Sequence, residues 1–123
     1  AVTRSDLSQI AQNLLVRFVA QRERDRTKSP LTAEELIDGW AEKCLILTEK
    51  TPDFDWGYWA RNTIKGTIEF LEQCRVLSSA YNCNTGVTYH FLGYRGSEWL
   101  KAVDQRLLSK IEELELLCDG VIS

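Results

Sequence analysis

The chain has no run of apolar residues long enough to cross a membrane. A membrane-spanning helix needs about 18 or more consecutive apolar residues, and charged residues interrupt every candidate stretch here. The N-terminus also has no apolar core of a secretory signal. Methionine is absent, so we expect the initiator, and any leader, to lie outside this sequence. These absences predict one cytoplasmic domain, residues 1–123, without a membrane partner.

Histidine and paired cysteines are also scarce. His90 is the only histidine, and the four cysteines include no C-x-x-C pair. The sequence has no Gly-rich phosphate loop, His-x-Glu pair or nucleophile elbow. We therefore expect no enzyme activity, no cofactor and no metal; zinc bound by Cys83, His90 and two further ligands is the less favoured alternative. We expect the cysteines to be buried free thiols, except Cys83, which a turn should expose.

Positive charge is in short supply and unevenly placed. The net charge is −3, which argues against a protein that coats nucleic acid without regard to sequence. Residues 1–29 carry a net charge of +3 and residues 30–123 a net charge of −6. Any binding to nucleic acid must therefore use a local basic face.

The first apolar stripe predicts a long N-terminal helix, which Ser5 or Asp6 could cap. Its core-facing residues recur at helical spacing and are Leu7, Ile10, Leu14, Leu15, Phe18 and Val19. The helix continues into the charged run QRERDRTKS before Pro30. That run is either a solvated helix end or a basic flank on which Arg22, Arg24 and Arg26 contact a DNA backbone.

A second helix is predicted from Thr32, because Thr32 and Glu35 have the spacing of a capping box. Gly39 costs helix stability but permits a close helix crossing. The expected buried face consists of Leu36, Ile37, Trp40, Cys44 and Leu45. A loop from Leu47 to Asp55 should follow.

The stretch from Trp56 to Gly96 predicts a helix, a β-hairpin and the start of another helix. Helical spacing runs to about Cys74, and Val76-Leu77 then begins an extended segment. The cluster from Asn82 to Gly86 is a turn, and residues 87–92 form a second strand rich in β-branched and aromatic residues. This order is the layout of a winged helix, with residues 30–96 as its core.

The third helix is the candidate DNA-reading element. Arg61, Asn62 and Lys65 are predicted on the face opposite its apolar stripe, with Tyr58 nearby. Arginine and asparagine suit base edges, and lysine suits phosphate. The alternative is an ordinary solvated face. The hairpin adds little charge, because residues 78–91 contain no lysine or arginine; it offers Asn84 at its tip, with Arg95 just beyond.

The last segment predicts one long helix over residues 97–120, begun by Ser97 and ended by Gly120. A small domain is not expected to cover so long an apolar seam, so the seam should pack on the first helix or on a second chain. The residues assigned to a dimer interface are Trp99, Leu100, Val103, Leu107, Ile111 and Leu114.

The stretch TIKGTIEFLEQCRVLSSAYNCNTGVTYHFLGYRGSEWLKAV resembles the PadR-like winged-helix regulators. In that family a helix of the type T-I-x-x-x-L precedes a hairpin ending in Y-x-L-T-x-x-G-x-x-x-L. Tyr89, Phe91-Leu92, Gly96 and Leu100 echo the second pattern. The family's aromatic-Gly-Tyr element after the first helix is absent and the hairpin is not basic, which indicates a divergent branch. The resemblance implies a repressor that dimerises through its terminal helix.

Together these patterns predict a mainly α fold with a small β-hairpin: a winged helix-turn-helix with long N- and C-terminal helices. The expected function is a sequence-specific DNA-binding repressor that acts as a homodimer on an inverted repeat in double-stranded DNA. The alternative is a winged helix that contacts only proteins, with Trp56, Tyr58 and Trp59 as anchors.

Overall fold

The computed structural model of the chain describes residues 2–51, 53 and 56–120. It is mainly helical, with a small three-stranded antiparallel sheet. In chain order the elements are α1 (Arg4–Arg24), β1 (Leu31–Thr32), α2 (Ala33–Lys50), α3 (Trp56–Tyr58), the π-helical turn η1 (Trp59–Thr63), α4 (Ile64–Gln73), β2 (Leu77–Asn82), β3 (Val87–Leu92), α5 (Gly96–Lys101) and α6 (Gln105–Cys118). The prediction of a mainly α chain with one β-hairpin is confirmed.

Both long N-terminal helices begin with capping boxes. In α1 the Thr3 hydroxyl accepts the Asp6 N–H, and the Asp6 carboxylate accepts the Thr3 N–H. The expected cap at Ser5 or Asp6 is therefore wrong: Asp6 is the third residue of the helix and completes the box from inside it. In α2 the box between Thr32 and Glu35 is confirmed.

The crossing of α1 and α2 depends on Gly39. A Cβ atom on Gly39 would lie 2.6 Å from Cζ of Phe18, so the phenyl ring occupies the space that a larger residue would need. The expected buried face of α2 is correct at Leu36, Trp40 and Cys44. It is wrong at Leu45, which is 71% exposed. Five residues separate Leu45 from Trp40, or about 1.4 helical turns, which places it on the opposite side of the helix.

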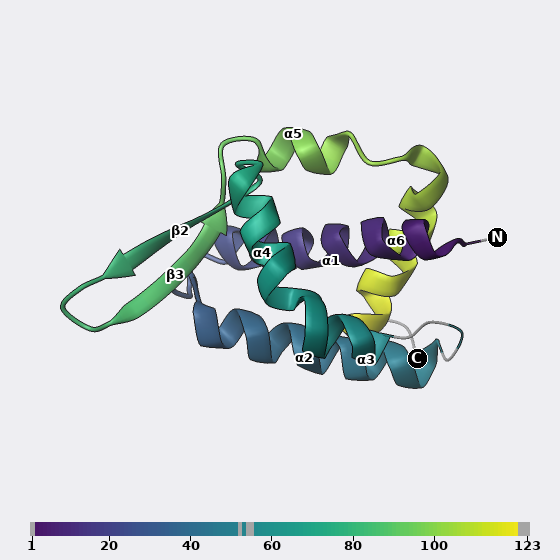
Figure 1. The fold of residues 1–123 in the computed structure, drawn as a ribbon, viewed down its shortest axis with the longest axis horizontal. Helices are drawn as coiled ribbons and strands as arrows, with labels where there is room; N and C mark the ends of the chain where they lie inside the picture. The colour runs from purple at the N-terminus through teal and green to yellow at the C-terminus, as the bar shows by residue number, and fades with distance from the viewer. Residues whose placement is uncertain (1, 52, 54–55, 121–123) are drawn as a thin grey trace.

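The sheet has the strand order β1-β3-β2. In the hairpin Ser79 lies opposite His90 and Asn82 opposite Val87. The two-residue strand β1, which the sequence analysis did not predict, adds to the other side of β3 by pairing Leu31 with His90. The hairpin projects away from the helices, at the end of the molecule opposite α6 (Figure 1).

The prediction of one long C-terminal helix is wrong. The helix α5 ends at Lys101, and α6 begins only at Gln105, where the side chain of Asp104 accepts the Arg106 N–H. Ser97 lies inside α5 and does not cap it. The residue that precedes the helix is Arg95, whose side chain makes no capping hydrogen bond. Gly120 follows α6 with a φ of +74°, as expected for a C-terminal glycine.

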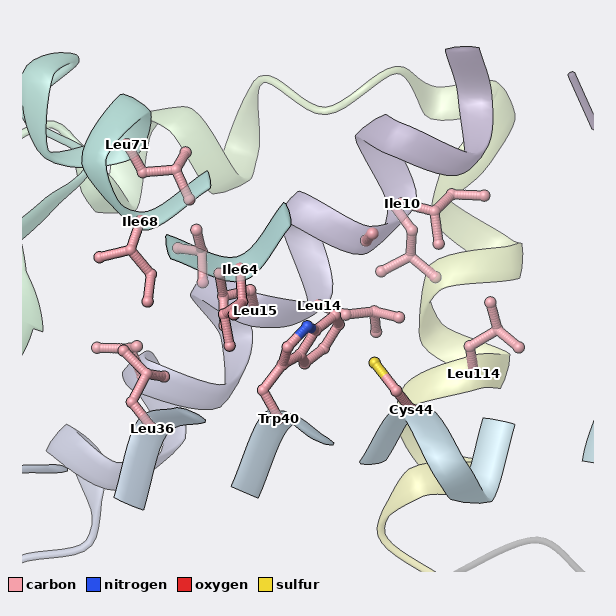
Figure 2. Packing of buried hydrophobic residues seen from close by; sticks show 14 of the residues in the cluster. Ile10, Leu14, Leu15, Leu36, Trp40, Cys44, Ile64, Ile68, Leu71 and Leu114 are labelled. Carbon is pink, nitrogen blue, oxygen red and sulfur yellow. The ribbon is translucent and has the colours of Figure 1, made fainter. Parts of the chain in front are cut away.

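The core lies where α1, α2, α4 and α6 meet (Figure 2). Ile10 and Leu14 of α1 face Leu114 of α6, while Leu15 lies beside Ile64 and Trp40. An ion pair closes the other end of α6: the exposed Arg106 donates to both carboxylate oxygens of the buried Asp6, at 3.0 and 2.6 Å. No described helix is both long and apolar enough to span a bilayer.

Candidate nucleic-acid interface

The third helical segment is built from α3, the π-helical turn η1 and α4. It starts at Trp56, which is fully buried and donates its indole N–H to the Thr51 hydroxyl at 3.0 Å. Trp56 is therefore not available as a surface anchor for a partner protein, contrary to the alternative prediction. Ile64, Ile68 and Leu71 bury the inner face of α4 against α1 and α2 (Figure 2).

The outer face of this segment is polar, with little net charge. Asn62 and Lys65 are exposed, as predicted for a reading helix. The exposed carboxylate of Glu69 lies one turn after Lys65, and Phe70 beside it is 51% exposed. The side chains of Tyr58, Trp59 and Arg61 lie outside the part that the structure describes.

The hairpin tip is fixed by its own backbone and by one asparagine. The Asn84 N–H donates to the side-chain oxygen of Asn82 at 3.0 Å, and the Gly86 N–H donates to the Asn82 carbonyl at 2.8 Å. Gly86 has a φ of +71°, which a residue without a Cβ adopts readily. Residues 78–86 are all exposed, so Asn84 is accessible at the tip, as the prediction requires.

The base of the hairpin is tied to α4 and α1 at several points. The Ser79 hydroxyl donates to Glu72 at 2.8 Å, and the Leu92 N–H donates to Glu23 at 2.8 Å. A Cβ on Gly93 would lie 2.2 Å from the carbonyl oxygen of Arg75, so the chain can pass here only as glycine. These contacts fix the direction in which the hairpin leaves the helices.

Two arginines meet at this base. The Arg95 N–H donates to the Arg75 carbonyl at 3.0 Å, and both side chains are exposed. The sequence analysis singled out Arg95 and missed Arg75. Arg75 has a φ of +64° in the turn after α4, a conformation that places its backbone beside Gly93. No pattern in the sequence indicates that an arginine adopts a positive φ in the turn after α4.

The basic flank of α1 does not act as one unit. Arg22 donates to Glu35 at 2.9 Å and to the Ser29 carbonyl at 3.1 Å, and only 20% of its side chain is exposed. This pair lowers the pKa of the Glu35 carboxyl below its usual range, with help from the Thr32 N–H. Arg22 is therefore paired within the chain, and its contact with a DNA backbone stays a prediction.

Arg24 projects away from the third helix. Leu15 lies against Ile64 of α4, whereas Arg24 lines a groove of about 350 Å³ with Ser97 and Lys101 of α5. The nine residues from Leu15 to Arg24 make about two and a half helical turns, which places the two on opposite sides of α1. Arg26 is exposed in the loop after α1. The three arginines and the third helix do not form one surface.

The residues assigned to a dimer seam divide into two groups. Leu107, Ile111 and Leu114 are at most 2% exposed and pack inside the single chain. The expectation that one domain could not cover them is wrong, because the turn before α6 lets this helix cross α1 and α2. Trp99, Leu100 and Val103 are half-buried and lie at the edge of the core.

Charge separates along the chain. Residues 56–96 contain four basic residues and two acidic ones, a net charge of +2, while the rest of the chain carries −5. Much of the acidic excess lies on the exposed side of α2, in the row Glu34, Asp38, Glu42 and Glu49. The third helix and hairpin are therefore one of two stretches with a positive net charge, the other being residues 1–29 at +3.

The buried histidine has a structural position. His90 is 7% exposed, and its Nδ1 has no hydrogen-bond partner among the described residues. Burial lowers its pKa, an effect that the nearby Glu72 carboxylate partly opposes. Cys83, the other residue of the zinc alternative, is exposed at the hairpin tip, and no group of three metal-ligating side chains gathers among the described residues.

Comparison with known proteins identifies no relative. No family model matches the chain, and neither the curated proteins nor the solved structures provide a match.

Proposed function

We propose that the chain is a winged-helix domain that binds double-stranded DNA and regulates transcription. The observation that carries the proposal is that the third helical segment, whose outer residues Asn62, Lys65 and Glu69 are exposed and polar, lies beside a projecting hairpin. Figure 1 shows this arrangement of α4 and the hairpin. Helix, short strand, two helices and a hairpin follow one another, and the strand order is β1-β3-β2. A winged helix has this connectivity, and it presents its third helix to the major groove.

Charge supports the same surface. DNA binding depends on cations that replace counterions at the phosphates, and residues 56–96 carry a net charge of +2 in a chain of net −3. Lys65 and the two arginines at the hairpin base are exposed there. A duplex that approaches from this side meets a segment of positive net charge.

The residues of this surface suit different contacts. Asn62 has the amide geometry that pairs with an adenine edge, whereas Lys65 fits a phosphate. Arg61 and Tyr58 belong to the same helical segment and are assigned to the interface on their sequence positions alone. At the hairpin, Asn84 offers an amide and Arg95 a guanidinium to the backbone of the duplex. Arg26 is the member of the N-terminal flank that we retain as a phosphate contact.

The regulator is proposed to act as a repressor and as a homodimer on an inverted repeat. Two copies related by a two-fold axis present two third helices about 34 Å, or one DNA turn, apart. Trp99, Leu100 and Val103 are the residues of the predicted seam that are not fully buried within one chain. The repressor role rests on the resemblance described above.

A matched pair of lysine variants tests the DNA surface. Lys65 is exposed on α4, and Lys101 is exposed on α5 in the groove that also holds Arg24, on the other side of α1. We expect Lys65→Ala to weaken binding to all duplexes and to reduce the salt slope by about one unit. Lys101→Ala should leave both unchanged. Equal effects of the two variants in fluorescence titrations would contradict the assignment of the third helix.

A second substitution tests base reading. Asn62→Ala should lower affinity for a selected duplex by about tenfold or more, because a bidentate base contact provides roughly 1–3 kcal/mol of discrimination. Its effect on random duplex DNA should be small. If Asn62→Ala weakens binding to both duplexes equally, Asn62 does not read sequence.

A specific observation favours a second candidate function, the binding of a partner protein by the same surface. The hairpin strands and tip carry no charged residue, and three aromatic side chains are exposed on or near it: Phe70 at 51%, Tyr81 at 66% and Tyr94 at 82%. Exposed aromatic residues are typical anchors of protein interfaces. Absence of DNA binding at low salt would make this candidate the better one.

A further inference from the structure

One strand of the sheet has an open edge. β3 lies between β1 and β2, and β2 pairs only with β3 among the described residues. Ser78 through Asn82 are all exposed. The outer edge of β2 therefore presents backbone N–H and C=O groups that can pair with another extended segment.

This edge lacks the usual protection. Proteins commonly block an edge strand with lysine, proline, inward-pointing charges or a very short strand. The strand β1, at the other edge, has only two residues, but β2 has six. Residues 77–92 contain no charged residue and no proline, and Tyr81 on β2 adds an aromatic side chain that is 66% exposed.

We propose that the edge of β2 pairs antiparallel with β2 of a second copy of this chain. A strand that adds here must be extended and uncharged along its length, because β2 itself has no charged side chain to pair with a basic or acidic peptide. The segment LSSAYN of the chain itself has that character. Two copies related by a two-fold axis form a self-complementary contact without like-charge repulsion along the strands.

The contacts around β2 also select a register. A two-fold axis perpendicular to the sheet keeps each side chain on the same face in both copies. Directly opposed residues of an antiparallel pair also share a face, so one residue at the axis must lie opposite its own counterpart in the second copy. A centre at Ser79 would bring together the two Glu72 carboxylates, each bound to its own Ser79 at 2.8 Å. A centre at Ala80 avoids this repulsion and places Tyr81 of the second copy opposite Ser79. Ser79 and Ala80 are the two central residues of β2, so we centre the pairing on Ala80, which joins two three-stranded sheets into one of six strands.

This inference deepens the proposed function, since it provides a dimer interface other than the predicted apolar seam of residues 99–114. Three of the six residues of that seam are buried within one chain. The β2 pairing and the proposed DNA binding can each fail without the other. The self-association of the chain is measured without DNA, and DNA binding can be measured for a monomer as well as for a dimer.

Sedimentation of an edge variant tests the pairing. Ala80→Lys places an ammonium at the centre of the edge, where two copies would bring their charges together. Thr85→Lys adds the same charge at the exposed turn, outside β2. We expect the wild-type chain and Thr85→Lys to dimerise at tens of micromolar, and Ala80→Lys to dimerise at least about tenfold more weakly. A wild-type chain that remains monomeric at hundreds of micromolar would overturn the proposal, as would an Ala80→Lys variant that dimerises normally.

Cross-linking tests the register independently of any loss of folding. Directly opposed residues of an antiparallel pair have Cα atoms about 4.5–5.5 Å apart, which a disulfide can bridge. In a Cys83→Ser background, Ala80→Cys should form a covalent dimer on oxidation by copper–phenanthroline. Thr85→Cys and the Cys83→Ser background itself should not. If sedimentation shows a dimer but Ala80→Cys gives no more cross-link than Thr85→Cys, the β2 pairing is wrong.

Discussion

Replacing Ile111 with alanine tests whether the C-terminal apolar seam belongs to the core of one chain. Ile111 is 0% exposed and lies in the same cluster as Ile10, Leu14 and Leu114. An isoleucine-to-alanine change in a core costs about 2–5 kcal/mol. We expect a value near the middle of that range, about 3 kcal/mol, because α1 and α2 both contact α6 and limit how far the site can collapse.

The loss is measurable by urea unfolding followed by far-ultraviolet circular dichroism. For a small domain, with a slope of roughly 1–3 kcal/mol per molar urea, the midpoint should fall by about 1–3 M. The matched control is Glu112→Ala, an exposed neighbour on the same helix, which should change stability by about 0.5 kcal/mol or less. A loss below about 1 kcal/mol for Ile111→Ala would refute the burial of this seam within one chain.

Three further changes test the hairpin base and the buried ionisable groups. Gly93→Ala should strongly destabilise the chain in thermal unfolding, because its Cβ would lie 2.2 Å from the Arg75 carbonyl oxygen; Gly66→Ala, with open space around it, should not. The hydrogen bond from Arg106 lowers the pKa of Asp6 well below its usual range. The stability that ionised Asp6 provides is therefore complete above the unfolded carboxyl pKa of about 3.9 and is lost as pH falls below that value. The melting temperature of Asp6→Asn should be lower than that of the unmodified chain at pH 7, and it should vary less between pH 5 and 3. Burial lowers the pKa of His90, so the folded chain should lose stability as pH falls below the unfolded value of about 6.5, and an NMR titration placing the His90 pKa above that value would contradict its burial.

Local sequence patterns predicted the features that local chemistry determines. Thr32 and Glu35 form their capping box because both partners lie within one helical turn. Gly86 tolerates the positive φ that the hairpin turn requires, and the side-chain oxygen of Asn82 accepts the Asn84 N–H two residues on. Gly39 was identified as a crossing point because a glycine inside a helix otherwise costs stability.

Features that depend on distant partners could not be read from the sequence. The strand β1 has two residues and exists only because Leu31 pairs with His90, far along the chain. The break before α6 interrupts an apolar spacing that continues across it from Val103 to Leu107, so periodicity alone gives one helix. Arg22 was assigned to DNA although it pairs with Glu35, because the packing of α1 against α2 was not known.

The salt dependence of DNA binding by the unmodified chain tests the central proposal most directly. The affinity for a duplex is measured by fluorescence anisotropy at several salt concentrations, starting from low ionic strength. The proposed surface carries five cations, four in residues 56–96 and Arg26, so log affinity should fall linearly with log salt, with a slope no steeper than about −4.5 per chain. Absence of binding at the lowest salt, or binding that does not change with salt, would contradict the proposal that this surface holds DNA.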